Sequence, residues 1–248
     1  MRTMLACLVV FGGVVAATSV SPQNPAAPAA GTDVYHVHFT KAAPGQATAL
    51  AKSLMVPDKT SPMPDHFVVL RHQEGDDWDY VVIQHLGSKA EVTATTPPPT
   101  DAQRALSAWH SDTFVSGPSW GDFSKEMSIG GSANAAGLVY VVGVQRPVPG
   151  HREQLLKSLS APGPSSKIQT GNVLLQHLEG GEWTFATITR YSSWQDFASE
   201  RAAAAVDAAA GSWADIRQHS IGFHETALLC DFRNVSEIDV RQRHSRSK

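Results

Sequence analysis

The chain repeats itself at a fixed offset of 105 residues, and this duplication constrains the fold more than any other feature. Val34-Tyr35-x-Val37 returns as Val139-Tyr140-x-Val142, and Pro44-Gly45 returns as Pro149-Gly150. The phrase His72-x-Glu-Gly-x-x-Trp78 returns as His177-x-Glu-Gly-x-x-Trp183. The offset holds without a gap from Val34 to about Ser88 and Ser193. Two copies of one structural unit therefore make up most of the chain.

Each copy carries the same order of predicted elements. A strand is followed by a helix that Pro-Gly opens, two strands joined by a Glu-Gly turn, a second helix and a closing strand. In the first copy these elements are predicted at Val34–Thr40, Gln46–Leu54, His66–His72, Trp78–His85, Thr100 to about His110 and Trp120–Met127. In the second copy they are predicted at Leu138–Gln145, His151–Leu159, Asn172–His177, Trp183–Tyr191, Ser193–Ala210 and Glu225–Phe232.

The order β-α-β-β-α-β, found twice, indicates an α+β fold built from two ferredoxin-like units. Such a unit covers only one face of its antiparallel sheet with helices, so the other face needs a partner. We expect the two open faces to pack together around a barrel-like interior. Both copies would then share one closed structure.

On these motifs the sequence resembles the dimeric α+β barrel superfamily. The resemblance rests on Pro44-Gly45 and Pro149-Gly150, on the hairpins with Trp78 and Trp183, and on units of about one hundred residues. It implies that two repeats in one chain replace the usual two subunits. Members include small antibiotic-biosynthesis monooxygenases, haem-degrading oxygenases and stress-responsive proteins, so the resemblance implies a fold more firmly than an activity.

The segments outside the repeats indicate export. Residues 1–17 have the positive start, apolar stretch and small residues of a signal peptide, and 18–32 form a Pro/Ala-rich tether. The first repeat is expected at 33–127, a Gly/Ser/Ala-rich linker at 128–137, the second repeat at 138–233 and a disordered basic tail at 234–248. We expect a periplasmic or extracellular protein without stable membrane insertion after cleavage.

Composition excludes some classes of function. A formal net charge of −3 gives no electrostatic footprint for nucleic acid. Cleavage of the signal would remove Cys7 and leave Cys230 alone, so no internal disulfide framework is expected. The remaining candidates are a small-molecule partner and an assembly of several copies.

The main candidate site lies on the first strand. His36 and His38 share one face of that strand, whereas Tyr35, Val37 and Phe39 share the other. We expect the apolar face to meet the helices and the histidines to face the interior. The second repeat carries Val141 and Gly143 at the matching positions, so the polar site belongs to the first repeat.

Arg71 and Gln84 are expected to point into the same interior as the two histidines. These four side chains could bind an anionic or carbonyl-bearing small molecule, with His36 or His38 as a general base and Arg71 as an anion stabiliser. Without a ligand, they could instead form a hydrogen-bonded polar core between the sheets or a partly solvated face. His36-x-His38 could also contribute two ligands to a metal ion, but the pattern places no carboxylate nearby, so no metal is predicted.

His110 and His219 form a second candidate pair. Each is expected at the end of a helix, where the helix dipole favours a cation. The resemblance implies a further role, because haem-handling relatives use a histidine of this region to bind iron. No other haem motif accompanies them, and the cofactor is left unknown.

Three functions therefore remain open. The first is an exported module that binds a small, partly apolar ligand between its sheets. The second is an enzyme resembling the cofactor-independent or haem-dependent monooxygenases. The third is a structural or assembly role, in which the second repeat only replaces a partner subunit.

Overall fold

The computed structural model describes residues 31–74, 77–88, 99–129, 137–160, 168–178, 182–209 and 220–229. The first half contains β1 (Asp33–Ala42), α1 (Ala47–Leu54), β2 (Phe67–Glu74), β3 (Tyr80–Ser88), α2 (Asp101–Arg104) and β4 (Ser107–Gly117). A helix, α3 (Trp120–Met127), follows. The second half contains β5 (Val139–Pro147), α4 (Arg152–Ser160), β6 (Gln169–His177), β7 (Phe185–Tyr191), α5 (Trp194–Ala209) and β8 (Ser220–Leu229). The predicted β-α-β-β-α-β order is confirmed in both halves.

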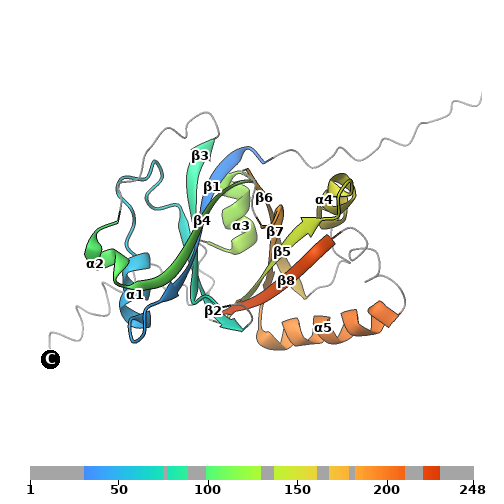
Figure 1. Ribbon diagram of the computed structural model, residues 1–248. Coiled ribbons are helices and arrows are strands. Elements are labelled where there is room, and N and C mark those ends of the chain that lie inside the picture. Colours follow the sequence, from blue (N-terminus) through green and yellow to red (C-terminus); the bar gives the residue numbers. More distant parts are fainter. Residues whose placement is uncertain are drawn as a thin grey trace, which may run out of the picture.

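The described strands close into one antiparallel barrel in the order β1-β3-β2-β8-β5-β7-β6-β4 (Figure 1). Within each half the sheet has the ferredoxin-like order, and the two halves join at β2 with β8 and at β4 with β6. The closing strand of each half thus pairs with the other half. The two repeats form an intramolecular version of a dimeric α+β barrel, as the duplication predicted.

The closing strand of the first half differs from the prediction. The capping box of Thr100 and Gln103 is present, but α2 ends at Arg104 and β4 then begins at Ser107. The predicted strand at Trp120–Met127 is instead α3, which begins after Ser119, whose hydroxyl accepts a hydrogen bond from the Asp122 amide. Trp120, Phe123 and Met127 recur at helical spacing, and this periodicity identifies the segment as a helix.

The closing strands β4 and β8 are equivalent in the two halves, but the offset between them differs from the 105 residues that separate the other elements. Tyr35 pairs with Val115, and the equivalent Tyr140 pairs with Leu228, which is 113 positions after Val115. The similar segments that begin at His110 and His219 lie only 109 positions apart in the sequence. This offset is four less than the 113 positions that separate equivalent residues of the two closing strands. Their similarity therefore does not mark equivalent positions.

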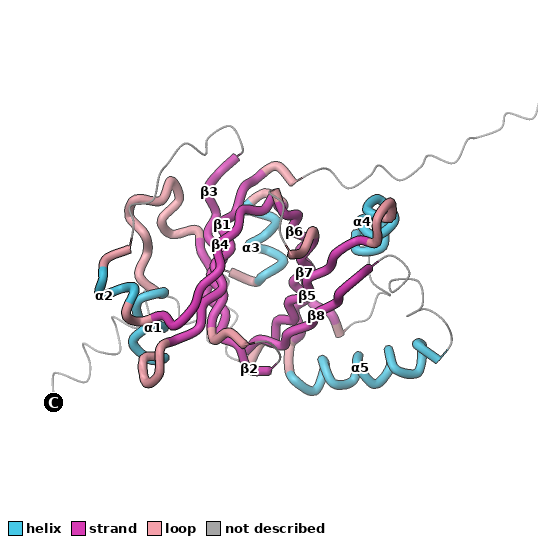
Figure 2. The backbone as a smooth tube through the Cα atoms, in the orientation of Figure 1, coloured by secondary structure: helices cyan, strands magenta, loops and turns pink. Residues whose placement is uncertain are grey.

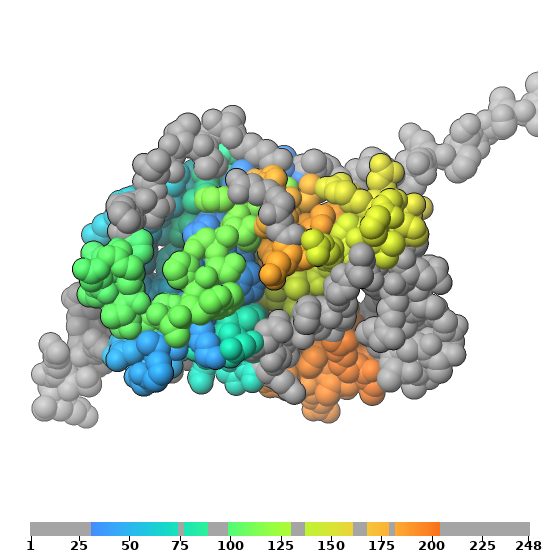
Figure 3. Space-filling model, viewed as in Figure 1, coloured from blue at the N-terminus to red at the C-terminus, as the bar shows by residue number. Residues whose placement is uncertain are grey.

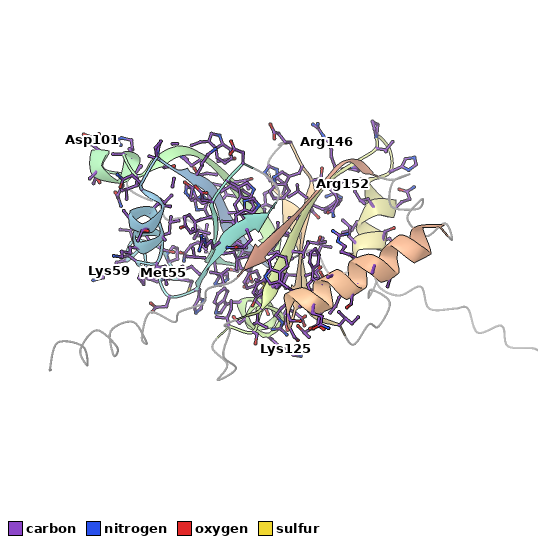
Figure 4. The ribbon with its side chains drawn as sticks, turned by 90° about the horizontal axis from the view of Figure 1, so that it is seen from below. Met55, Lys59, Asp101, Lys125, Arg146 and Arg152 are labelled. Atoms are coloured by element: carbon purple, nitrogen blue, oxygen red, sulfur yellow. The ribbon has the colours of Figure 1, made fainter. Side chains whose placement is uncertain are left out.

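The barrel interior is an apolar core to which both halves contribute. Tyr35 and Val37 of β1 lie in one cluster with Tyr140 and Val142 of β5, and these residues are almost fully buried. Figure 4, seen from below, shows side chains crowded between the strands of the two halves. Each fully buried apolar side chain stabilises the fold by about 1.5–3 kcal/mol. The predicted interior exists, but side chains fill it.

Helix α3 packs against β6 at one side of the barrel (Figure 2), and its residues Gly121, Asp122 and Lys125 are exposed. Phe123 and Met127 are fully buried in the shared core. The Tyr35 hydroxyl donates to the Pro118 carbonyl at 2.7 Å, and the Tyr140 hydroxyl donates to the Met127 carbonyl at 2.6 Å. Each half therefore holds one end of α3.

The other helices lie on the outside of the barrel. In the second half, Trp194 and Phe197 of α5 pack over Val139, Val141 and Tyr191. In the first half, Leu50 of α1 is buried and the Tyr80 hydroxyl donates to the Ala47 carbonyl. No helix in the described part of the chain is long and apolar enough to cross a membrane.

Because α3 lies close to β6, adding one methyl group at Gly171 of β6 should destabilise the fold. A Cβ added at Gly171 would lie 2.1 Å from the backbone oxygen of Glu126, a contact that the backbone must move to relieve. We expect Gly171→Ala to lower the free energy of unfolding in urea by about 1–3 kcal/mol.

Gly121→Ala is the matched control, because a Cβ at Gly121 in α3 meets nothing closer than 3.9 Å. It should leave stability within about 1 kcal/mol of the native value. Equal stability of the Gly171→Ala variant and the native protein would contradict the packing of α3 against β6.

Candidate functional site

The alternation along β1 is as predicted, but the two faces point the opposite way. Tyr35 and Val37 face the barrel interior, whereas the side chains of His36 and His38 lie on the outer face with 32% and 22% exposure. The expectation that the histidines face the interior is therefore wrong. The closed barrel buries the inward face of β1 against apolar residues of both halves, so the apolar face belongs there.

Asp112 of β4 brings the two histidines together. It lies directly opposite His38 in the antiparallel ladder of β1 and β4. One carboxylate oxygen, Oδ1, lies 2.7 Å from His38 Nδ1 and 2.9 Å from His36 Nε2. Both ring nitrogens donate to this one oxygen, so a single carboxylate orients two imidazoles.

His110 completes this group, which we call the outer cluster: His36, His38, His110 and Asp112. His110 Nε2 lies 3.4 Å from the second carboxylate oxygen, and its ring centroid lies 5.5 Å from that of His38. Because His110 and Asp112 are two apart on β4, their side chains share the outer face. The strand, and not the predicted helix end, places His110 here.

The outer cluster keeps Asp112 ionised. Partial burial would raise the pKa of its carboxyl group, but the hydrogen bonds from His36 and His38 outweigh burial and hold the pKa well below its usual range. In its neutral form, each imidazole carries its proton on the nitrogen that faces Asp112. Their other nitrogens, His36 Nδ1 and His38 Nε2, are left with free lone pairs.

An aromatic ring borders the polar group. Phe114 lies opposite His36 on β4, with ring centroids 5.3 Å apart, and it is 40% exposed. The segment that contains α2 and β4, green in Figure 3, lies at the surface of the first half. The outer cluster thus combines hydrogen-bonding nitrogens with an accessible apolar surface.

Arg71 and Gln84 do not join the two histidines. Arg71 is exposed and pairs across β2 and β3 with Tyr80, so β3 separates it from β1. Gln84 lies opposite His36 in the ladder, but its amide donates to the Met63 carbonyl at 2.7 Å and to the Ser61 hydroxyl. Gln84 therefore fastens the loop between α1 and β2.

The second half lacks an equivalent of the outer cluster on β5. Val141 stands at the position of His36, and it is buried beneath α5. The helix α5 has 16 residues, whereas α2 has only four. The expected asymmetry between the repeats is thus present, and it comes from helix cover as well as from residue type.

The described residues of this face do not form a metal site. No three histidine, cysteine or carboxylate side chains in the described ranges are arranged to hold a metal ion. One nitrogen each of His36 and His38 is taken up by its contact with Asp112. The neighbours of His110 on this face include His38 and Asp112. His219 lies outside the described residues.

Asp112 and Phe114 are the residues that the sequence reasoning missed. In their segment, His110-Ser-Asp-Thr-Phe114, the predicted helix ends at about His110, and the residues after it belong to no predicted element. The alternation in this segment places His110, Asp112 and Phe114 on one side and Ser111, Thr113 and Val115 on the other. This period of two is the signal that could have identified β4 and the missing carboxylate.

Comparisons with known proteins place the fold. No protein-family model and no curated sequence matches the chain. A proposed monooxygenase from Fusobacterium nucleatum subsp. nucleatum has a TM-score of 0.51 at 10% identity, over 80% of this chain and 92% of that chain. An anthrone oxidase-like protein has a TM-score of 0.50 at 14% identity, over 80% and 92%. A chlorite dismutase variant from Candidatus Nitrospira defluvii reaches only 0.42 at 13% identity, over 84% and 94%.

This chain has the dimeric α+β barrel fold. The first two structures and the closed barrel agree on that point, and the duplication puts both halves on one chain. At such low identities the likeness concerns the fold and not the activity. The resemblance inferred from the Pro-Gly motifs and the hairpins is confirmed.

The outer cluster predicts a pH-dependent stability. Because the folded state lowers the pKa of Asp112, the carboxylate stabilises the fold above its unfolded pKa, and this contribution is lost as the pH falls through the acid range. We expect Asp112→Asn to cost about 1 kcal/mol of unfolding free energy at pH 6 and less at pH 3.

Urea denaturation at the two pH values measures this difference. Asp101→Asn is the control, because Asp101 is 97% exposed and only pairs with Arg104 on the surface. It should change stability little at either pH. An Asp112→Asn effect that is equal at both pH values would contradict the assigned hydrogen bonds.

Proposed function

We propose that the protein binds a small, partly apolar molecule on the outer face of its first half and exchanges a proton with it. The observation that carries this proposal is the pairing of two imidazoles with one carboxylate oxygen of Asp112. The apolar side chains of the shared core occupy the interior, so the ligand site moves from between the sheets to this face. Phe114 supplies an apolar contact next to His36.

The chemistry of the outer cluster suits general base catalysis. A neutral imidazole near pH 7 can accept a proton, and an ionised carboxylate behind it stabilises the imidazolium that forms. His38 makes the shorter contact with Asp112, so it is the proposed base, and His36 is positioned beside it to bind the ligand anion. The proton would come from an acidic C–H or O–H group of the ligand.

The proposed reaction class is a cofactor-independent, monooxygenase-like oxidation. A base that removes a proton from an activated CH₂ group creates a carbanion that dioxygen can oxidise. The overall change converts R–CH₂–R′ and O₂ into the ketone R–CO–R′ and water, so it needs no further reductant. The names of two proteins that share the fold, a proposed monooxygenase and an anthrone oxidase-like protein, support this choice.

Two further properties are proposed from the sequence. The signal-like residues 1–17 support export to the periplasm or the outside of the cell. Association of several copies of the chain is also proposed. Mass spectrometry of the secreted protein tests the first, and sedimentation of the purified protein tests the second.

Anthrone serves as the probe for binding and turnover. We expect anthrone to raise the melting temperature of the native protein and to be oxidised to anthraquinone with consumption of one O₂. His38→Ala should weaken binding about tenfold or more, equivalent to ~1.4 kcal/mol, and should abolish oxidation.

Arg71→Ala is the matched control, because Arg71 shares the outer face but lies beyond β3. It should bind and oxidise anthrone as the native protein does. If His38→Ala changes only stability, the protein has the structural role instead. A Soret band after haemin addition that His110→Ala removes would favour the haem-dependent alternative.

A further inference from the structure

A second histidine–carboxylate group lies at one end of the barrel, apart from the outer cluster. It consists of Asp33 at the start of β1, His66 just before β2, His85 on β3 and Trp120 at the start of α3. We call it the end cluster. His85 is only 4% exposed, and the other three residues are half-buried.

The hydrogen bonds of the end cluster run in one direction. Asp33 Oδ2 accepts from His85 Nε2 at 2.9 Å and from the Trp120 backbone amide at 3.0 Å. His85 Nδ1 and His66 Nδ1 lie 3.1 Å apart, so one hydrogen atom is shared between them. With the His85 proton committed to Asp33, His66 Nδ1 is the donor and His85 Nδ1 is the acceptor.

The same imidazoles hold the first turn of α3 by stacking. The Trp120 ring lies nearly parallel to His66, with centroids 4.6 Å apart and an interplanar angle of 10°. It also stacks on His85 at 5.4 Å and on Phe123 at 5.5 Å. The end cluster therefore connects the titratable pair His66 and His85 to α3, whose Phe123 is buried in the barrel core.

We propose that the end cluster is a proton-operated latch, which keeps the N-terminal turn of α3 docked at neutral pH and releases it in mild acid. When both imidazoles are neutral, one hydrogen atom lies between His66 Nδ1 and His85 Nδ1 and forms a hydrogen bond. If both rings are doubly protonated, two N–H groups face each other at the contact between His66 and His85. The contact must then open, and Trp120 loses its stacking partner.

Burial and the neighbouring histidine both favour the neutral form of His66, so the latch is closed at neutral pH and opens in acid. Burial lowers the pKa of His66, and the neighbouring His85 lowers it further, against the opposing effect of Asp65. A histidine with a lowered pKa in the folded state contributes stability above its unfolded value of about 6.5, and this stability is lost as the pH falls below it.

The other titratable groups packed around the pair do not reverse this direction. Asp33 on β1 already accepts hydrogen bonds from His85 and Trp120. Burial raises the pKa of Tyr35, so its hydroxyl stays neutral, and Asp122 on α3 bonds to the Ser119 hydroxyl. None of these groups is left to pair with a second proton on the imidazoles.

Release would affect one end of α3 only. At the other end, the Tyr140 hydroxyl donates to the Met127 carbonyl and the Asn172 amide donates to the Glu126 carboxylate. The N-terminal turn would thus lift while the C-terminal turn stays attached to the second half. Phe123 would leave the core, and this end of the barrel would open.

Tryptophan emission between pH 8 and pH 5 tests the latch, with Trp120→Phe used to assign the signal. We expect the Trp120 component to shift to longer wavelength below about pH 6.5, while far-UV circular dichroism stays unchanged. His66→Phe keeps an aromatic ring against Trp120 but cannot titrate, so the shift should disappear. His110→Gln, in the exposed outer cluster, should keep it.

A native protein without this shift, or the same shift in His66→Phe, would overturn the proposal. If His66→Phe does not fold, hydrogen–deuterium exchange of the native protein at pH 7.5 and 5.5 decides the question. After correction for intrinsic rates, the amides of residues 119–124 should lose protection at pH 5.5, whereas those of β5 should not. Equal protection of residues 119–124 at both pH values would also overturn it.

Discussion

The closure of two duplicated half-barrels around one apolar core is the constraint on which the structure depends. Each half exposes an apolar sheet face that it cannot cover alone, and the two faces close around Phe123 and Met127. Hydroxyl groups from both halves, Tyr35 and Tyr140, bond to the carbonyls that flank this helix. The helix therefore links the two repeats. A barrel closed in this way has an interior lined by apolar side chains of both halves.

Polar chemistry is consequently placed on the outside of the barrel and at its end. On the outer face, helix cover decides what is accessible. The 16-residue α5 buries Val141 in the second half, whereas the four-residue α2 leaves His36 and His38 partly open to solvent. Duplication thus supplied two sheet faces, and the shorter helix over one of them leaves that face partly exposed.

Much of the fold could be predicted from the sequence, because the repeat and the alternation along strands specify topology. The orientation of β1 could not, since alternation shows which residues share a face but not which face is drier. The position of β4 was also missed, because the closing strands correspond at 113 positions and not at 105. Because the predicted helix covers the start of β4 and no element covers the rest, no carboxylate could be placed beside the histidines, and Asp112 was overlooked.

The two histidine–carboxylate groups use the same chemistry in different surroundings, and the surroundings separate their roles. In the outer cluster the carboxylate accepts two imidazole protons at a partly open face, so the remaining nitrogens can exchange protons with a ligand. In the end cluster His85 is buried, and the proton positions are coupled to the stacking of Trp120. Under the two proposals, a proton gained at the outer face alters binding, whereas a proton gained at the end alters packing. Burial, more than residue type, decides which of the two follows.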